Sequence, residues 1–481
     1  FSVDNAQNLV HRCVLVPQGV TYAAQRPDPN EQSEFLTSTE QWFRPVNLLT
    51  GPDGMLYIVD MYRDIIEDYS AIPRYLQQLY VKSLIAGANR GRIWRVVPEH
   101  AHQRRSIDLA GMPSAQLVSC LADANVWWQE TSQRLLVERS DRSVSGLLRS
   151  QLAQCDVPHG RLRALYVLEG LALLTPDLIT TALADASPVV RVHALRLAER
   201  WIAEPAVLQA MLRLEADPHP RVRLQFALSL GTSDSAQAVS ALAQLAARED
   251  LDTWLEAALV SSSLTTADRL VTQLLQDPAR PPAVSLLHAL CSVVGARREP
   301  GQLPRLLATL ARRGDQDPPP VQAACLAGLL DGLQRGDAVA QPAPDIVPPI
   351  QRLLRSERAA AQRLALQVAH QLRVAQLEEM QTLFAEAYQQ AVDERAPLDE
   401  RRRSIGLLAA APPDTLQAVA ETLLSPQQPV ELQIAVVQAA GQTDESPTIP
   451  LLLDQFAGCT PQLQSAVLDV VFTRQSSLAL L

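Results

Sequence analysis

Hydrophobic residues follow two different patterns along the chain. Up to about residue 100 they come in short runs of β-branched and aromatic residues, separated by Gly, Pro, Asn and Asp. This pattern is typical of strands joined by tight turns. After about residue 105, apolar residues recur at i, i+3, i+4 and i+7 in windows that Pro, Asp and Gly interrupt. The second pattern predicts a succession of short amphipathic helices.

A short motif repeats in the helical part. Its clearest copy reads Asp185-x-x-Pro188-x-x-Arg191, and the copies begin 29 to 33 positions apart, at Asp123, Asp156, Asp185, Asp217 and Asp250. Such a period indicates stacked helix pairs. Pro suits the first turn of a helix, and we expect the Arg one turn later to reach the Asp of the neighbouring repeat. The motif resembles that of the HEAT repeat, which predicts about ten helix pairs over residues 106–481.

A β-hairpin is predicted between residues 42 and 60. One apolar run at 42–49 leads into Gly51-Pro52-Asp53-Gly54, and a second follows at 55–60. Glycine supplies the backbone angles of a tight turn, and hairpins of this form occur as inner strands of β-propeller blades. A third strand is expected at 91–96. Residues 8–12, 14–16 and 20–22 are expected to be outer strands of the preceding blade, with a turn at 17–19 between the last two. The segment 61–89 is expected to be an insertion with a helix at 73–85, acting as a lid or a buttress.

The first hundred residues resemble a known family. The resemblance lies in Glu34-Phe35-Leu36, Trp42-Phe43-Arg44-Pro45-Val46-Asn47, Asp60-Met61-Tyr62-Arg63 and Gly91-Arg92-Ile93-Trp94-Arg95. These motifs look like the last blades of the large membrane-bound-dehydrogenase-like proteins of planctomycete-type bacteria, whose propeller is similar to glucose/sorbosone dehydrogenases. The implied fold class is multidomain β + α. Terminal blades of a β-propeller at 1–98 would be followed by an α-solenoid of HEAT-like helix pairs at 106–481.

The resemblance also implies a function for the intact protein. It would be an exported, quinone-type dehydrogenase-like protein of the periplasm or cell envelope that oxidises a carbohydrate, with pyrroloquinoline quinone and haem c as cofactors. No cofactor is expected within this segment, which would close the propeller and serve as scaffold. The chain opens in mid-pattern at Phe1 and is expected to be a fragment. The alternative is a non-enzymatic HEAT-repeat scaffold at the cell envelope that binds a protein partner along its groove.

Four residues near the predicted hairpin are candidates for cofactor or substrate binding. They are Arg44, Asp60, Arg63 and Glu67. The arginines would offer paired donors to a carboxylate-rich quinone or to sugar hydroxyls; the alternative is salt bridging within the loop. The family often has His after the glutamate, where this chain has Asp68. No catalytic residue is assigned.

Composition narrows the classes of function. The 481 residues carry 42 basic and 52 acidic side chains, a formal net charge of −10, which argues against nucleic acid as a partner. The longest uncharged apolar run, 281–296, contains His288 and is too short to span a membrane. The six cysteines are isolated, so neither a zinc site nor a haem-attachment motif is predicted. His100-x-His102 has metal-ligand spacing but no third ligand nearby, and no metal site is predicted.

Overall fold

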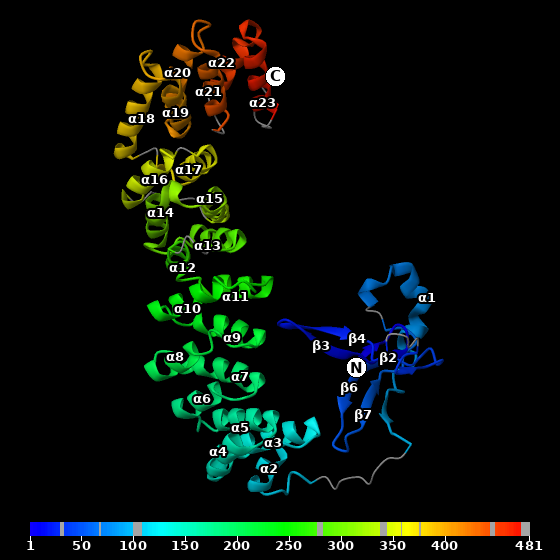
Figure 1. Cartoon of the computed structure of the whole chain (residues 1–481). Helices are drawn as coiled ribbons and strands as arrows, with labels where there is room; N and C mark the ends of the chain where they lie inside the picture. The colour runs from blue at the N-terminus through cyan, green and yellow to red at the C-terminus, as the bar shows by residue number, and fades with distance from the viewer. Residues whose placement is uncertain are drawn as a thin grey trace. The chain divides into compact units, whose positions relative to one another are not determined.

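The computed structural model describes residues 1–28, 33–66, 69–99, 108–276, 282–336, 344–356, 358–374, 377–442 and 448–472. Small antiparallel sheets occupy the N-terminal part, and helices occupy the rest (Figure 1). The chain divides into two compact units, Phe1–Ser229 and Leu230–Leu481. Five predicted positions lie outside the described residues: Glu67, His100, His102, and the expected solenoid limits Ser106 and Leu481.

The strands form three separate antiparallel sheets, ordered β1-β2-β5, β3-β4 and β6-β7-β8. Their bounds are β1 Ser2–Asp4, β2 Leu9–His11, β3 Val14–Gln18, β4 Thr21–Gln25, β5 Leu36–Thr37, β6 Pro45–Thr50, β7 Leu56–Asp60 and β8 Arg92–Val96. The predicted hairpin is confirmed as β6 and β7, with Gly54 at a φ of +78° in its turn. The third strand is confirmed as β8, which pairs with β7. The expected helix of the 61–89 insertion is present as α1 (Arg74–Ile85).

The expected outer strands differ from the prediction in their pairing. Residues of β3 and β4 form a hairpin of their own and are not hydrogen-bonded to β2. The reason lies in β2, because β1 and β5 already occupy its two edges. A strand that follows β2 after only Arg12 and Cys13 therefore has no free edge of β2 to pair with.

A small apolar core holds the two three-stranded sheets of the N-terminal part. Val10 of β2 and Ile58 of β7 are fully buried, and Phe43 is 5% exposed. Partly buried side chains from several strands pack around them: Val3, Leu36, Leu48, Leu56 and Val96. Alternating positions of each strand thus supply one buried face.

The helical part consists of consecutive helix pairs, and eleven pairs lie within the described ranges where about ten were predicted. In the first unit they are α2 Ser114–Cys120, α3 Val126–Arg139, α4 Ser145–Gln154, α5 Pro158–Gly170, α6 Pro176–Leu183, α7 Pro188–Ala198, α8 Pro205–Leu212 and α9 Pro220–Leu230. They continue as α10 Ala236–Ala246, α11 Thr253–Ser262, α12 Ala267–Leu274, α13 Val284–Arg297, α14 Gln302–Arg313, α15 Pro319–Arg335, α16 Val347–Leu354 and α17 Ala359–Gln371. The last are α18 Glu378–Val392, α19 Leu398–Leu407, α20 Pro413–Leu423, α21 Val430–Ala440, α22 Thr448–Asp454 and α23 Pro461–Phe472.

The first helix of a pair packs on the first helix of the next pair, and the second helix packs on the next second helix. First helices stack as α10, α12, α14, α16, α18, α20 and α22, and second helices stack as α3, α5 and α7 in one unit and α13, α15 and α17 in the other. Buried positions follow the helical period; in α7 they are Val190, Ala194, Leu195 and Ala198. Each pair therefore buries its apolar stripe against its neighbours, as a solenoid requires. Within each unit, we call the surface formed by its odd-numbered helices from α3 onwards the second-helix face of that unit.

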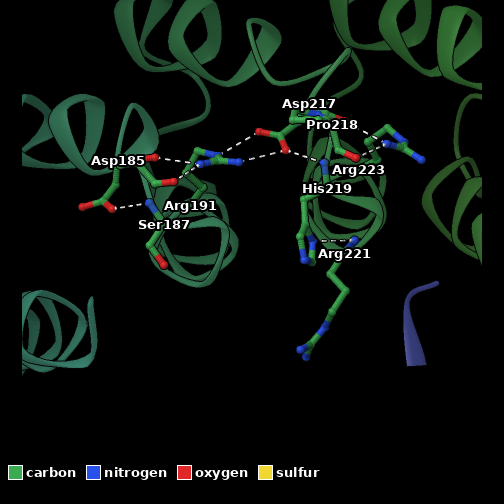
Figure 2. Close-up of polar contacts among 9 residues, drawn as sticks. Asp185, Ser187, Arg191, Asp217, Pro218, His219, Arg221 and Arg223 are labelled. Atoms are coloured by element: carbon green, nitrogen blue, oxygen red, sulfur yellow. Dashed lines mark hydrogen bonds and ion pairs between the residues drawn. The ribbon is translucent and has the colours of Figure 1, made fainter. Parts of the chain in front are cut away.

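Arginine and aspartate side chains connect successive pairs in the first unit, as the repeated motif predicted (Figure 2). Nε and an amino group of Arg191 donate to the two carboxylate oxygens of Asp217 at 2.8 and 3.0 Å. Arg161 donates to Asp185 in the same two-point manner, with both distances 2.7 Å. We call these four residues the Asp–Arg ladder. Its side chains are at most 12% exposed, so solvent screens the ladder little.

Each member of the ladder also holds the turn on its own side. The remaining amino group of Arg191 donates to the backbone carbonyls of Asp185 and Ala186 at 2.8 and 3.0 Å. Asp217 accepts from the backbone N–H of His219 at 2.9 Å. The ladder therefore fixes both the turn inside a pair and the position of the next pair.

The pKa of Asp185 lies below its ordinary value. Burial opposes ionisation of this carboxyl, but hydrogen bonds from the Arg161 side chain and the Ser187 N–H outweigh burial. The ionised form is therefore favoured more strongly in the folded chain than in the unfolded chain.

In the second unit α13 and α15 approach each other through glycines. A Cβ added at Gly328 or Gly332 would overlap the backbone carbonyl of His288 or Ser292, respectively. Gly295 of α13 faces the backbone of α15 in the same way. The absence of side chains at these positions lets the two backbones pack closely.

Replacing Gly328 or Gly332 with alanine should lower the stability of the second unit. The added methyl group must displace helix backbone, and overpacking of this kind costs about 1–3 kcal/mol. Gly406→Ala is the matched control, because a Cβ there meets no atom within 4 Å. Its higher helix propensity should stabilise the chain by up to about 1 kcal/mol. Differential scanning calorimetry of the three variants measures both effects; equal melting temperatures for all three would contradict the close-packing interpretation.

Asp185→Asn should make the chain less sensitive to acid. The Asp185 carboxylate stabilises the fold fully above its unfolded-state pKa of about 4, and this stabilisation is lost as the pH falls through the lowered folded-state pKa. At neutral pH the variant should be less stable by about 1–3 kcal/mol. Melting temperatures of both proteins between about pH 7 and about pH 3 measure the difference, which should shrink towards acid. A difference that stays constant over this range would contradict a contribution from the ionised carboxylate.

Candidate functional site

Asp60, one of the predicted binding residues, is buried at the end of β7 and is 1% exposed. Its Oδ1 accepts hydrogen bonds from the backbone N–H groups of Arg44 and Tyr62, both at 2.9 Å. Its Oδ2 accepts one from the indole N–H of Trp94 at 2.9 Å. Asp60 therefore connects the strands and loops that surround it.

The guanidinium group of Arg44 is surrounded by backbone carbonyls. It donates to the carbonyl oxygens of Asn5, Arg63 and Asp64 at 2.9, 3.1 and 2.7 Å. The structure thus brings Arg44 and Asp60 together with the backbone of Arg63, while Glu67 lies outside the described residues. A role for these residues in binding a quinone or a sugar stays a prediction.

The β6–β7 turn contacts the first helix pair. Asn125, which caps α3, donates from its side chain to the carbonyl of Gly51 at 2.9 Å. The indole N–H of Trp128 donates to the carbonyl of Pro52 at 2.8 Å, and Trp128 is 1% exposed. These hydrogen bonds tie α3 to the hairpin turn.

Polar side chains continue along the second-helix face of the first unit. Arg163 of α5 donates to the side-chain oxygens of Gln129 and Gln133 of α3 at 3.0 and 2.7 Å. Two adjoining hollows of about 300 and 400 Å³ share Gln133 and Arg163 in their walls. The remaining wall residues are Gln129, Glu130, Arg134, Val137, Glu138, His159, Leu162 and Tyr166.

The next step along this face is a tyrosine–histidine contact. The Tyr166 hydroxyl lies 2.8 Å from Nδ1 of His193 on α7. Burial raises the pKa of Tyr166 and lowers the pKa of His193, and the positive charge of Arg196 lowers the histidine's further. Both groups are therefore neutral at neutral pH, which suits a positioning contact between helices.

In the second unit this face carries a groove of about 620 Å³ across α17, α19 and α21. Each helix contributes one face, at positions that repeat every three or four residues. The lining residues are Ser356, Gln362, Arg363, Leu366, Asp399, Arg402, Arg403, Gly406, Ala435, Gln438, Ala439 and Gln442. At this place α17 packs against the 3-10 turn Leu408–Ala410 that follows α19, which leaves room between the two helices.

Three consecutive arginines of α19 have two different roles. Arg401 is 5% exposed and donates to the carbonyl of Ala391 at 2.9 Å, so it supports the fold. Arg402 and Arg403 are exposed and line the groove. The sequence pattern alone gave no function to the three arginines at 401–403 and did not predict the groove. The groove depends on Arg363, Arg402 and Gln438 lying side by side on consecutive second helices. The helical period of each segment does not show which residues of different helices become neighbours.

The side chains along the second-helix face can form hydrogen bonds with a ligand. Arginine and glutamine side chains supply donors and acceptors along the second-helix face. In the part of the chain that the structure describes, no group of three or more His, Cys, Asp or Glu side chains is placed to hold a metal ion. Among the same residues, no helix has the length and apolar content needed to cross a membrane.

Two family models match parts of the chain. One is described as HEAT repeats and matches residues 175–263, which include three motif copies and three ladder residues. This region is thus a HEAT-repeat region within a mostly helical solenoid. The other is described as a domain of unknown function, DUF7133, and matches residues 1–100. No curated protein matches the chain.

Solved structures similar to the chain include three helical proteins at low identity. A C-terminal fragment of the Chaetomium thermophilum cohesin loader SCC2 is 14% identical, with a TM-score of 0.33, over 74% of this chain and 34% of that one. A mutant of Kap121p is 13% identical, with a TM-score of 0.33, over 84% and 45%. The CpcE–CpcF complex of phycocyanin lyase from Nostoc sp. PCC7120 is 16% identical, with a TM-score of 0.20, over 62% and 94%. The chain thus spans about a third of the cohesin-loader fragment and under half of Kap121p.

Proposed function

We propose that this chain is a non-enzymatic interaction scaffold that binds a protein partner on its second-helix face. The observation that carries the proposal is the presence of polar hollows on this face in both units. In the first unit, by contrast, the polar groups of the loops between helices form hydrogen bonds with one another in the Asp–Arg ladder, so they are not available to a partner. The second-helix face is therefore the surface whose donors and acceptors can meet another chain.

The residues of the face suit a protein partner. Arginine combines an apolar stem with five donors, and glutamine offers both a donor and an acceptor. The −10 net charge of the chain makes a phosphate backbone a poor partner, because neutralising phosphates requires a basic surface. HEAT repeats stack into extended surfaces that are larger than a small-molecule site, which favours a polypeptide.

A second proposal concerns the sheets of the N-terminal part. We propose that β6, β7 and β8 form a blade of a β-propeller, since they make an antiparallel three-stranded sheet with two unpaired edges. Ile93 of β8 lies on the opposite face from the buried Ile58 and is 66% exposed, as expected of a face that packs against another sheet. On this proposal a complete propeller would need further blades.

Two of the four predicted binding residues, Arg44 and Asp60, form their hydrogen bonds within the chain. The Arg44 guanidinium donates to backbone carbonyls, and the Asp60 carboxylate accepts from Trp94. These groups are therefore already engaged and are not directed at a cofactor. The descriptions of the two family models, HEAT repeats and a domain of unknown function, do not name a dehydrogenase. Sugar oxidation at the cell envelope with pyrroloquinoline quinone and haem c remains a hypothesis for an intact protein, and the scaffold is the function we propose for this chain.

Site-specific photo-cross-linking in the cells that make the protein tests the scaffold. A benzophenone amino acid is placed at Arg134 or Gln438 on the second-helix face, or at Leu147 or Arg352 on first helices α4 and α16. We expect one protein to be cross-linked from both second-helix positions and from neither first-helix position. Mass spectrometry identifies it.

The two first-helix positions are the matched controls, because Leu147 is 47% exposed and Arg352 is exposed. The same cross-linked protein from both faces would contradict a face-specific scaffold. Absence of any cross-linked protein from Arg134 and Gln438 would contradict a scaffold that uses this face.

A further inference from the structure

The groove on α17, α19 and α21 has a charge opposite to that of the chain. Its walls carry three arginines and one aspartate, whereas the whole chain has 42 basic and 52 acidic residues. A concave surface between low-dielectric walls concentrates the field of the charges that line it. The groove therefore attracts anionic groups although the chain as a whole is acidic.

The three arginines are available to a partner. Arg363 is exposed, and no ion pair or hydrogen bond of its side chain occurs among the described residues. Arg402 lies 3.3 Å from Asp399, but these side chains are 58% and 75% exposed, so the pair is weak. Arg403 has a single long hydrogen bond, 3.3 Å, to the carbonyl of Asp399 in its own helix. None of the three is held by a buried carboxylate.

The floor of the groove is low, and its far wall offers amides. Gly406, Ala435 and Ala439 line the floor, and a Cβ added at Gly406 would meet no atom within 4 Å. On the α21 side, Gln438 is exposed and lines the groove. Its side-chain amide carries both donors and an acceptor, which fit the C=O and N–H groups along the backbone of a bound peptide.

We propose that this groove binds an extended acidic segment of the protein partner. The proposal rests on the scaffold function above and names the chemistry of one docking site within it. Arg363, Arg402 and Arg403 would pair with Asp or Glu side chains, and Gln438 would form hydrogen bonds with the peptide backbone. Guanidinium groups match carboxylates with two parallel hydrogen bonds, which makes these contacts specific as well as attractive.

The size of the groove agrees with a short segment. Directly packed helices have axes about 8–10 Å apart, and α17 and α19 are not directly packed, so the three helices span at least about 20 Å. An extended chain needs about six residues or more to cover this distance. A segment of this length with two or three carboxylates would match the arginines and still leave backbone groups for Gln438.

Fluorescence anisotropy with the purified full chain tests the proposal. The ligand is a fluorescein-labelled peptide of about ten residues that alternates Asp and Ser, compared with the same peptide carrying Asn for Asp. The test variant is R363Q/R402Q/R403Q, in which glutamine keeps the helix propensity. The matched control is R335Q/R352Q/R355Q, which removes the same charge at exposed arginines outside the groove.

We expect the acidic peptide to bind, more weakly at high salt, and the groove variant to bind it on the order of tenfold less tightly. The control variant should bind like the unmodified chain, and the Asn peptide should not bind. Equal weakening by both variants, or no weakening by the groove variant, would overturn the proposal. So would tighter binding of a single-stranded oligonucleotide of equal charge, lost in the groove variant, because the groove would then select phosphates. Circular dichroism confirms that both variants remain folded.

The two proposals can fail separately. If a partner is cross-linked from Gln438 but the acidic peptide does not bind, the scaffold proposal stands and the proposal of an acidic segment is wrong. If the acidic peptide binds at the groove but no protein is cross-linked specifically from the second-helix face, the peptide-binding proposal stands and the scaffold proposal is wrong in its present form.

Discussion

The paired hydrogen bonds between an arginine of one repeat and an aspartate of the next are the interaction on which the repeated part of the first unit depends. In an isolated helix pair, the apolar stripe would remain exposed, so each pair needs the next one in a fixed position. Arg191 sets this position because it binds its own turn and the Asp217 carboxylate simultaneously. Loss of either partner would leave a charge that is almost completely buried, which costs far more than an exposed ion pair contributes.

This constraint also determines which surface is left for function. The ladder occupies the turns that open the second helices, and its donors and acceptors are satisfied within the chain. The outward side chains of the second helices are not needed to hold successive pairs in position. In the first unit they form contacts such as Arg163 with Gln133, and in the second unit they leave Arg363 and Arg403 exposed around a groove. The same stacking that buries the core therefore aligns polar residues from distant parts of the sequence.

The sequence predicted what depends on local rules. Proline and arginine at fixed spacing after Asp185 and Asp217 predicted the ladder, and Gly54 predicted the β6–β7 turn. It did not predict that the β3–β4 hairpin is separate from β2, because β2 pairs with β5, a strand that begins 25 positions after β2 ends. The groove was missed for a similar reason. Arg401, Arg402 and Arg403 look alike in sequence, and only packing shows that the first is buried and the others are exposed.

A double-mutant cycle at Arg191 and Asp217 tests the central claim most directly. Native-state hydrogen exchange of α7 and α9 amides gives the local free energy of opening for the unmodified chain, Arg191→Gln, Asp217→Asn and the double variant. This readout is preferable to global unfolding, because repeat arrays can open in parts. The account predicts a coupling of about 1–3 kcal/mol, with the double variant little worse than either single variant. Additive effects, with a coupling under about 0.5 kcal/mol, would contradict the claim that this contact holds successive repeats together.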